Sequence, residues 1–387
     1  MPNGPVPGVV AFQSSDLPAI HSQAAQLMIL GAQLRGEATS ERIPTEDLTQ
    51  LTLPSVAVAR GRIDSRRMRT AMASRYALSE DAMLAGPVGP VVTSTVIPDL
   101  AARHFKVPTP LTVDELLEGS LGHPHELVRV SAATAYFDRS SEPNRLVKIL
   151  EEGTRSTDAL TRHVAATSLS HVAPESSALD SLLVSGGGSR AAGAASHTTT
   201  IVHGTWATGS PWWKPNGDFF NYLTQTLPNL PRTAPFPSTP PWSAPYAADD
   251  YFYWTGGYSD AARADGAEKL AQWVISRNAQ GLDLFTHSHG GNVAMLATQP
   301  GMAMSSKEMV LLSCPVHFPK YEPDFTKVQK IVSIRVHLDL VILADRGGQR
   351  FPDPRIQENV LGIWFDHFAT HNPQNWTNAK YNIPARL

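Results

Sequence analysis

A serine in the second half of the chain has the neighbours that a catalytic nucleophile needs. Ser288 follows an apolar segment at 281–286, and the residues behind it, His-Gly-Gly, are typical of a turn into a helix. A serine hydroxyl is a weak nucleophile until a base takes its proton, and a sharp strand-to-helix turn exposes the hydroxyl to such a base. The backbone N–H of His289, at the helix start, can stabilise charge on a substrate oxygen. These residues predict nucleophilic chemistry at Ser288.

The segment resembles the nucleophile elbow of the α/β-hydrolase family, in particular that of bacterial lipases and esterases. The family's Gly-x-Ser-x-Gly reads Thr286-His-Ser-His-Gly290 here, so a threonine occupies a position where a small residue is usual. The resemblance covers residues 200–387. It implies a serine hydrolase that cleaves carboxylic esters through a Ser-His-Asp triad and an acyl-enzyme intermediate, with a lipid-like or other small acyl ester as substrate.

The resemblance also implies where the acid and the base of the triad lie. The family's acid follows the penultimate strand, where Asp339 fits best; Asp345 is a rival that we assign to a solvated turn, because an arginine and two glycines follow it. The base belongs after the last strand. His367 is favoured because it follows the strand end directly, and His371 remains the alternative.

A further loop is similar to the His-Gly-x loop of lipases. It reads His203-Gly-Thr-Trp206, and the resemblance places the second oxyanion N–H on Thr205. The stretch after it, 207–250, is rich in aromatic residues and prolines, so it can wall an acyl pocket or simply cover an edge of the sheet. The candidate pocket residues are Trp206, Trp212 and Trp213.

Metal and cofactor chemistry has little support in the sequence. His287 and His289 form a His-x-His pair, a spacing that can bind zinc, but no other histidine or carboxylate cluster of recognisable spacing accompanies it. Gly-x-Gly-x-x-Gly, Walker and Cys-x-x-Cys motifs are absent. We therefore expect neither a metal nor a cofactor.

The elements that must position these residues alternate between strands and helices. Such alternation predicts an α/β fold, a minimal α/β-hydrolase core whose mostly parallel sheet is covered on both faces by helices. Arg263 is expected to tie its helix to the aromatic turn before it. The expected strands are 199–203, 251–254, 281–286, 309–314, 331–336 and 360–365; the expected helices are 218–227, 259–278 and one capped by Asn372.

The first half of the chain predicts a separate all-α domain. The segment 127–134 recurs at 160–167, a similarity that resembles HEAT-type repeats, with an ordinary helical bundle as the alternative. A Gly/Ser/Ala-rich segment at 185–198 is typical of a linker. We predict a helical domain at 1–184, which is a candidate for binding a protein partner, and a hydrolase domain at 199–387.

Composition narrows the remaining possibilities. A net charge of −3 with 17% charged residues does not favour nucleic-acid binding or an anionic membrane surface. The single cysteine, Cys314, excludes an intrachain disulfide and ends an apolar run where burial is expected. With neither a signal-peptide pattern nor an apolar run of about 18 residues, a cytoplasmic protein is expected. The alternative functions are a binding protein with a degenerate hydrolase fold, or a hydrolase of thioesters or amides.

Overall fold

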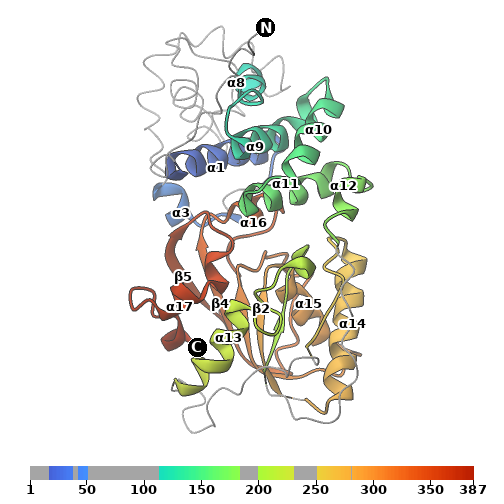
Figure 1. Ribbon diagram of the computed structural model, residues 1–387, viewed down its shortest axis with the longest axis vertical. Helices are drawn as coiled ribbons and strands as arrows, with labels where there is room; N and C mark the ends of the chain where they lie inside the picture. The colour runs from blue at the N-terminus through green and yellow to red at the C-terminus, as the bar shows by residue number, and fades with distance from the viewer. Residues whose placement is uncertain (1–16, 38–41, 51–112, 184–198, 231–250, 280) are drawn as a thin grey trace, which may run out of the picture. The chain divides into compact units, whose positions relative to one another are not determined.

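The computed structural model divides the chain into two compact units, Met1–Ala173 and Pro174–Leu387. It describes residues 17–37, 42–50, 113–183, 199–230, 251–279 and 281–387 (Figure 1). The predicted linker at 185–198 lies outside these ranges.

The described part of the first unit is helical. Asp158 caps helix α11, and its carboxylate accepts a hydrogen bond of 2.8 Å from the Thr161 N–H. His125 caps α9 through Nδ1, which accepts from the Leu127 N–H at 3.2 Å. The α-helices are α1 (Leu17–Leu34), α3 (Thr45–Gln50), α8 (Val113–Ser120), α9 (Glu126–Tyr136), α10 (Pro143–Gly153) and α11 (Ala159–Val172), with a 3-10 turn, η2 (Phe137–Arg139).

The two similar segments of this unit lie on α9 and α11. The Thr134 hydroxyl of α9 donates to the Ser168 hydroxyl of α11 at 2.7 Å. Between them, a Cβ added to Gly153 of α10 would lie 2.7 Å from both the Val130 and the Ala165 side chains. Small residues therefore let the three helices approach closely. The assignment to HEAT-type repeats stays a prediction.

The second unit is built on a five-stranded sheet in which every neighbouring pair is parallel (Figure 1). The strands lie in chain order, with Ile201 of the first beside Phe285 of the second. The predicted α/β fold with a parallel sheet is confirmed. The strands are β1 (Thr199–Val202), β2 (Leu282–His287), β3 (Ser306–Leu312), β4 (Val328–His337) and β5 (Ile356–Trp364).

Helices cover both faces of this sheet, as alternation along the strands requires. Leu284 and Met309 pack in one core with apolar residues of α14 and α15. Their strand neighbours Phe285 and Val310 face a second core that contains Phe219 of α13 and Trp376 of α17. The α-helices of this unit are α12 (Ser177–Asp180), α13 (Asp218–Gln225), α14 (Asp260–Ser276), α15 (His289–Ala297), α16 (Leu340–Ala344) and α17 (Pro373–Thr377); the 3-10 turns are η3 (Ala207–Gly209), η4 (Leu227–Asn229), η5 (Ala369–His371) and η6 (Ile383–Arg386).

The predicted strand at 251–254 is wrong. Its side chains do alternate: Phe252 and Trp254 are buried in the first core, whereas Tyr251 and Tyr253 pack against the second. The segment nevertheless joins no strand ladder among the described residues. The Trp254 indole N–H instead donates to the His203 carbonyl at 2.8 Å. The alternation of the side chains therefore reflects their burial on two sides, although the main chain of this segment pairs with no described strand.

Two local predictions of the sequence are confirmed. Asn372 caps α17, and its side-chain oxygen accepts a hydrogen bond of 3.0 Å from the Gln374 N–H. Pro373 is the first residue of the helix, as predicted. Arg263 of α14 donates to the Tyr258 carbonyl, and its Nε donates to the Tyr321 hydroxyl at 2.8 Å. The arginine thus ties α14 to the turn before it.

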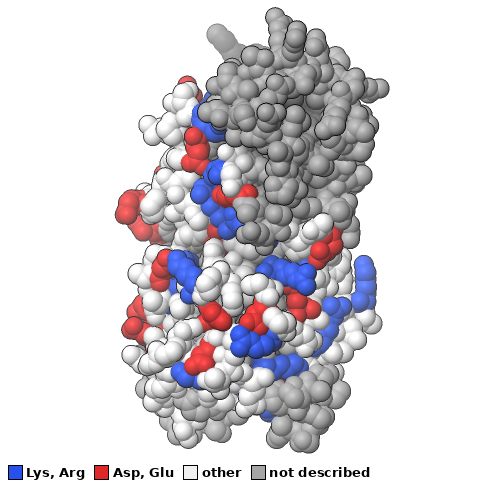
Figure 2. All heavy atoms as spheres, turned by 180° about the vertical axis from the view of Figure 1, so that it is seen from behind, with Lys and Arg blue, Asp and Glu red and all other residues white. Residues whose placement is uncertain are grey.

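The distribution of charged side chains on the surface and the apolar content of the described helices agree with the composition. On the face shown in Figure 2, acidic and basic side chains of the described residues are interspersed. Among the described helices, none is long and apolar enough to cross a membrane. Cys314 is buried, as predicted.

Candidate active site

Ser288 lies between the end of β2 and the start of α15 in a backbone conformation that a non-glycine residue rarely adopts. Its φ is 54° and its ψ is −135°. Hydrogen bonds hold this turn: the Ser288 N–H donates to the Leu312 carbonyl at 2.9 Å, and the Gly291 N–H donates to the Ser288 carbonyl at 3.0 Å. Backbone strain of this kind costs about 1–3 kcal/mol and concentrates at functional sites. The turn is the one that the sequence predicts.

Two glycines allow the elbow to lie directly against the loop that follows β1. A Cβ on Gly290 would lie 2.3 Å from the Val202 carbonyl oxygen and 2.6 Å from that of His203. A Cβ on Gly204 would lie 2.7 Å from the Ser288 Cβ. Any larger residue at either position would separate the serine from this loop.

The unusual threonine of the elbow is accommodated within the sheet. Thr286 is fully buried on β2, and its hydroxyl donates to the Val310 carbonyl of β3 at 3.1 Å. Since the hydroxyl has an acceptor, its burial costs little. The departure from the family's motif at this position is therefore compatible with the turn.

The predicted oxyanion donors lie on the two segments that meet at the elbow. In the part of the chain that the structure describes, neither the Thr205 N–H nor the His289 N–H has a hydrogen-bond acceptor. Trp206, with a φ of 54°, redirects the loop, and its N–H donates to the Gly256 carbonyl at 3.0 Å. Two backbone donors beside a serine hydroxyl are suited to binding a developing oxyanion.

The predicted acid and base are in direct contact. His367, 1% exposed after β5, bonds through Nδ1 to the Asp339 carboxylate at 2.8 Å. The structure brings them together because the parallel strands β4 and β5 are neighbours that end at the same edge of the sheet. A carboxylate on Nδ1 fixes the tautomer that leaves Nε2 free to act as a base.

Asp339 is itself held rigidly. One carboxylate oxygen caps α16, where it accepts the Val341 and Ile342 N–H groups at 3.0 and 3.2 Å. The Gln349 amide pairs with the main chain of Asp339, accepting from its N–H and donating to its carbonyl, both at 3.1 Å. The other carboxylate oxygen is thereby aimed at the imidazole.

The rival base, His371, occupies a different environment. Its ring stacks on Trp212 with centroids 4.1 Å apart, and its centroid lies 4.5 Å from that of His287. The His367 ring is 4.6 Å from His287, whose Nε2 contacts the His367 carbonyl at 3.1 Å. Within the described ranges, the Ser288 hydroxyl makes no hydrogen bond to either histidine. The structure therefore shows the expected pair of His367 with Asp339, but no hydrogen bond between Ser288 and His367.

The candidate pocket residues are all buried. Trp213 is fully buried; its indole N–H donates to the Ala207 carbonyl at 2.8 Å, and its ring lies 4.2 Å from that of His203. Trp206 stacks on Tyr258 with centroids 5.5 Å apart. Most of the remaining aromatic stretch, 231–250, lies outside the described residues. A role for these tryptophans in substrate binding stays a prediction.

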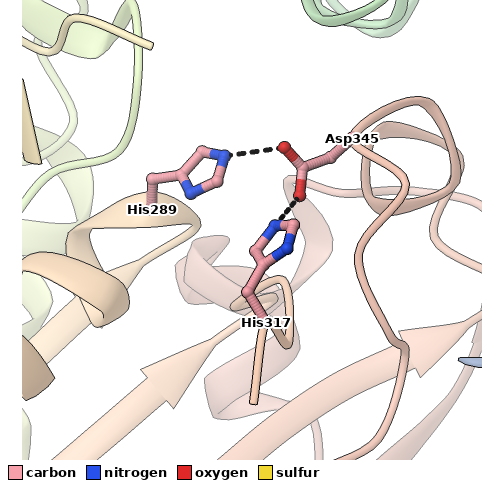
Figure 3. Close-up of side chains that lie close together, drawn as sticks. All are labelled: His289, His317 and Asp345. Carbon is pink, nitrogen blue, oxygen red and sulfur yellow. Dashed lines mark hydrogen bonds and ion pairs between the residues drawn. The ribbon is translucent and has the colours of Figure 1, made fainter. Parts of the chain in front are cut away.

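The expected solvated turn at Asp345 is wrong, because this side chain is 2% exposed and contacts His289 and His317 (Figure 3) as well as Tyr258. Its carboxylate accepts from the Tyr258 hydroxyl at 2.5 Å and contacts His289 Nε2 at 2.9 Å and His317 Nε2 at 2.5 Å. Burial alone would raise the pKa of Asp345, but the two imidazoles outweigh it and hold the pKa well below its usual range. No sequence spacing relates these residues, since they come from three separate loops and helix ends.

His289 takes part in this second cluster through its side chain. Burial lowers the pKa of His289 to about 4, against the opposing effect of Asp345. The neutral ring then donates Nε2–H to Asp345, while Nδ1 lies 2.9 Å from the Asn292 amide nitrogen and accepts from it. His289, whose N–H is the predicted oxyanion donor, is therefore anchored at both ring nitrogens.

Comparison with protein families, with curated proteins and with solved structures finds no match to this chain.

Proposed function

We propose that this protein is a serine hydrolase of the esterase or lipase type, with an α/β-hydrolase core in its second unit. Ser288 attacks an acyl carbonyl, His367 takes the serine proton and returns it to the leaving group, and Asp339 stabilises the imidazolium that forms. The N–H groups of Thr205 and His289 bind the oxyanion. Water then hydrolyses the acyl-enzyme.

The observation that carries the proposal is the bond of 2.8 Å between His367 Nδ1 and Asp339. Both residues are nearly excluded from water, and they follow neighbouring strands of the sheet whose second strand ends at the strained Ser288. A buried carboxylate that orients a histidine is the arrangement that nucleophilic catalysis by serine requires. The two backbone donors without acceptors supply the remaining part.

The test is hydrolysis of a short p-nitrophenyl ester by the full-length chain and by Ser288→Ala. Removal of the nucleophile from such a unit costs about 10⁴- to 10⁶-fold in turnover. Ser276→Ala is the matched control, because Ser276 is exposed at the end of α14 and its hydroxyl bonds only to near neighbours in the chain, donating to the Trp273 carbonyl and accepting from Arg277. Equal rates for wild type and Ser288→Ala would refute the proposal. A panel of ester, thioester and amide substrates then identifies the bond cleaved.

A binding protein with an inactive hydrolase fold is the second candidate. It is favoured by the absence of a hydrogen bond from the Ser288 hydroxyl to a described residue and by Thr286 in the elbow. A fluorophosphonate probe separates the two functions, because only an activated serine is labelled. Labelling of the wild type that is lost in Ser288→Ala supports the hydrolase. A folded wild type that stays unlabelled supports the binding protein.

A further inference from the structure

The second cluster, His289, His317 and Asp345, contains the donor atoms of a metal site. One nitrogen from each histidine and a carboxylate oxygen all lie within 4.8 Å of one another (Figure 3). Two imidazoles and one carboxylate form a donor set that zinc uses, with one further position for a water molecule or another oxygen. We propose that this cluster binds a divalent transition-metal ion, zinc in the first instance.

Burial distinguishes this cluster from acidic groups that merely gather at a surface. His289 is 3% exposed and Asp345 is 2% exposed. A buried carboxylate is costly unless it is paired, and here it is surrounded by two imidazoles and the Tyr258 hydroxyl. The His317 side chain, 25% exposed, gives the cluster a route to solvent. An ion can therefore enter a site that is otherwise closed.

The three residues are also fixed independently of one another. His289 begins α15, and Asp345 caps the end of α16. His317 follows Val316, which forms an isolated antiparallel bridge with Gly348. Ligands that come from separate rigid elements are positioned before an ion binds, which lowers the entropy cost of binding.

The present distances require a small adjustment. Ligand atoms about 2.1 Å from a tetrahedral zinc ion lie about 3.4 Å from one another. The His289 and His317 nitrogens are 2.9 and 2.5 Å from the Asp345 oxygens. A shift of less than about 1 Å, made mostly by the more exposed His317, opens the cluster to that spacing. Each Nε2 then gives its lone pair to the metal, and its proton moves to Nδ1.

An outer partner for His289 is already in place. A metal-bound histidine usually donates its second ring N–H to a neighbouring acceptor. Asn292 lies 2.9 Å from His289 Nδ1, and a half-turn of its amide presents the oxygen as that acceptor. The Cys314 sulfur, 3.6 Å from the present amide oxygen, can accept from the rotated amide nitrogen. The polar groups around the ring therefore remain paired when the metal binds.

The experiment measures zinc on the full-length chain, untagged and stripped with a chelator. After one equivalent of zinc is added and the unbound metal removed, we expect one zinc per chain by elemental analysis. His317→Ala should weaken binding by more than about 100-fold, since even the loss of an outer partner costs about 10- to 100-fold. His171→Ala, at an exposed histidine of α11, is the matched control and should bind as the wild type does.

A second readout keeps the test independent of folding. His317→Gln retains a polar side chain at this partly exposed position, and its far-ultraviolet circular dichroism should match that of the wild type while zinc is lost. Cobalt substitution should give the visible absorption of a four- or five-coordinate site in the wild type alone. No retained zinc in the wild type, or as much zinc in His317→Ala and His317→Gln as in the wild type, would overturn the inference. Because zinc and not ester hydrolysis is measured, the outcome does not depend on the proposed function.

Discussion

The two aspartates that flank helix α16 bind histidines in different ways. Asp339, before the helix, uses one oxygen to cap it and the other to hold the single imidazole of His367. Asp345, after the helix, caps it through its backbone N–H alone, and its carboxylate oxygens contact His289, His317 and Tyr258. One carboxylate thus holds a single imidazole, whereas the other contacts two imidazoles and a phenol. Similar burial and the same residue type therefore support different chemistry, and the number of partners makes the difference.

The largest expected effect distinguishes the two aspartates by activity. Asp339→Asn should lower ester hydrolysis about 10⁴-fold, because an amide cannot hold the imidazole in the tautomer that leaves Nε2 basic. Asp345→Asn should cost about tenfold, since His289 loses one anchor but keeps its backbone N–H. The measurement is turnover at saturating substrate for both variants. Similar losses of turnover in the two variants would contradict the different roles of Asp339 and Asp345.

Alanine substitutions of one glycine beside Ser288 and one beside Asp345 compare how tightly the two sites are packed. Gly290→Ala places a Cβ against two carbonyl oxygens of the main chain, so we expect a loss of about 3 kcal/mol or more in the free energy of unfolding. Gly347→Ala places its Cβ 2.9 Å from an Asp345 carboxylate oxygen and 3.0 Å from the Pro315 Cβ, which are side-chain and not main-chain contacts, and should cost about 1 kcal/mol.

The measurement for these glycine variants is urea unfolding followed by circular dichroism. Gly362→Ala is the control, because nothing lies within 4 Å of its added Cβ. A Gly290→Ala protein as stable as this control would show that the elbow is not packed against the β1 loop as described.

A further expected effect, smaller than that of Gly290→Ala, concerns a single hydrogen bond of the second cluster. Tyr258→Phe removes the hydroxyl that donates to Asp345 at 2.5 Å, but leaves both imidazoles in place. Burial, followed by the nearby Asp345 carboxylate, raises the pKa of Tyr258 well above its usual range, so the phenol is protonated and donates at neutral pH. The loss should be about 1.5 kcal/mol, the lower end of the range for one hydrogen bond to a charged group, because both imidazoles still pair the carboxylate. Thermal unfolding at neutral pH provides the measurement, and a loss as large as that of Gly290→Ala would contradict it.

The sequence by itself determined the features that depend on local order. The apolar run before Ser288 and the glycines behind it specify the elbow, and Asn372-Pro373 specifies the start of α17. The βα alternation predicts a parallel sheet with both faces covered, and in the structure β4 and β5 are neighbours in that sheet. The contact of Asp339 with His367 follows from that topology together with the family resemblance.

Only the tertiary structure decided which residues distant in the chain are buried together. Asp345 reads as a solvated turn because an arginine and two glycines follow it, yet His289 and His317 surround its carboxylate. The segment 251–254 alternates as a strand does, but its main chain joins no ladder within the described ranges. Burial and pairing depend on what the rest of the chain brings to a position, and neither composition nor spacing near these residues carries that information.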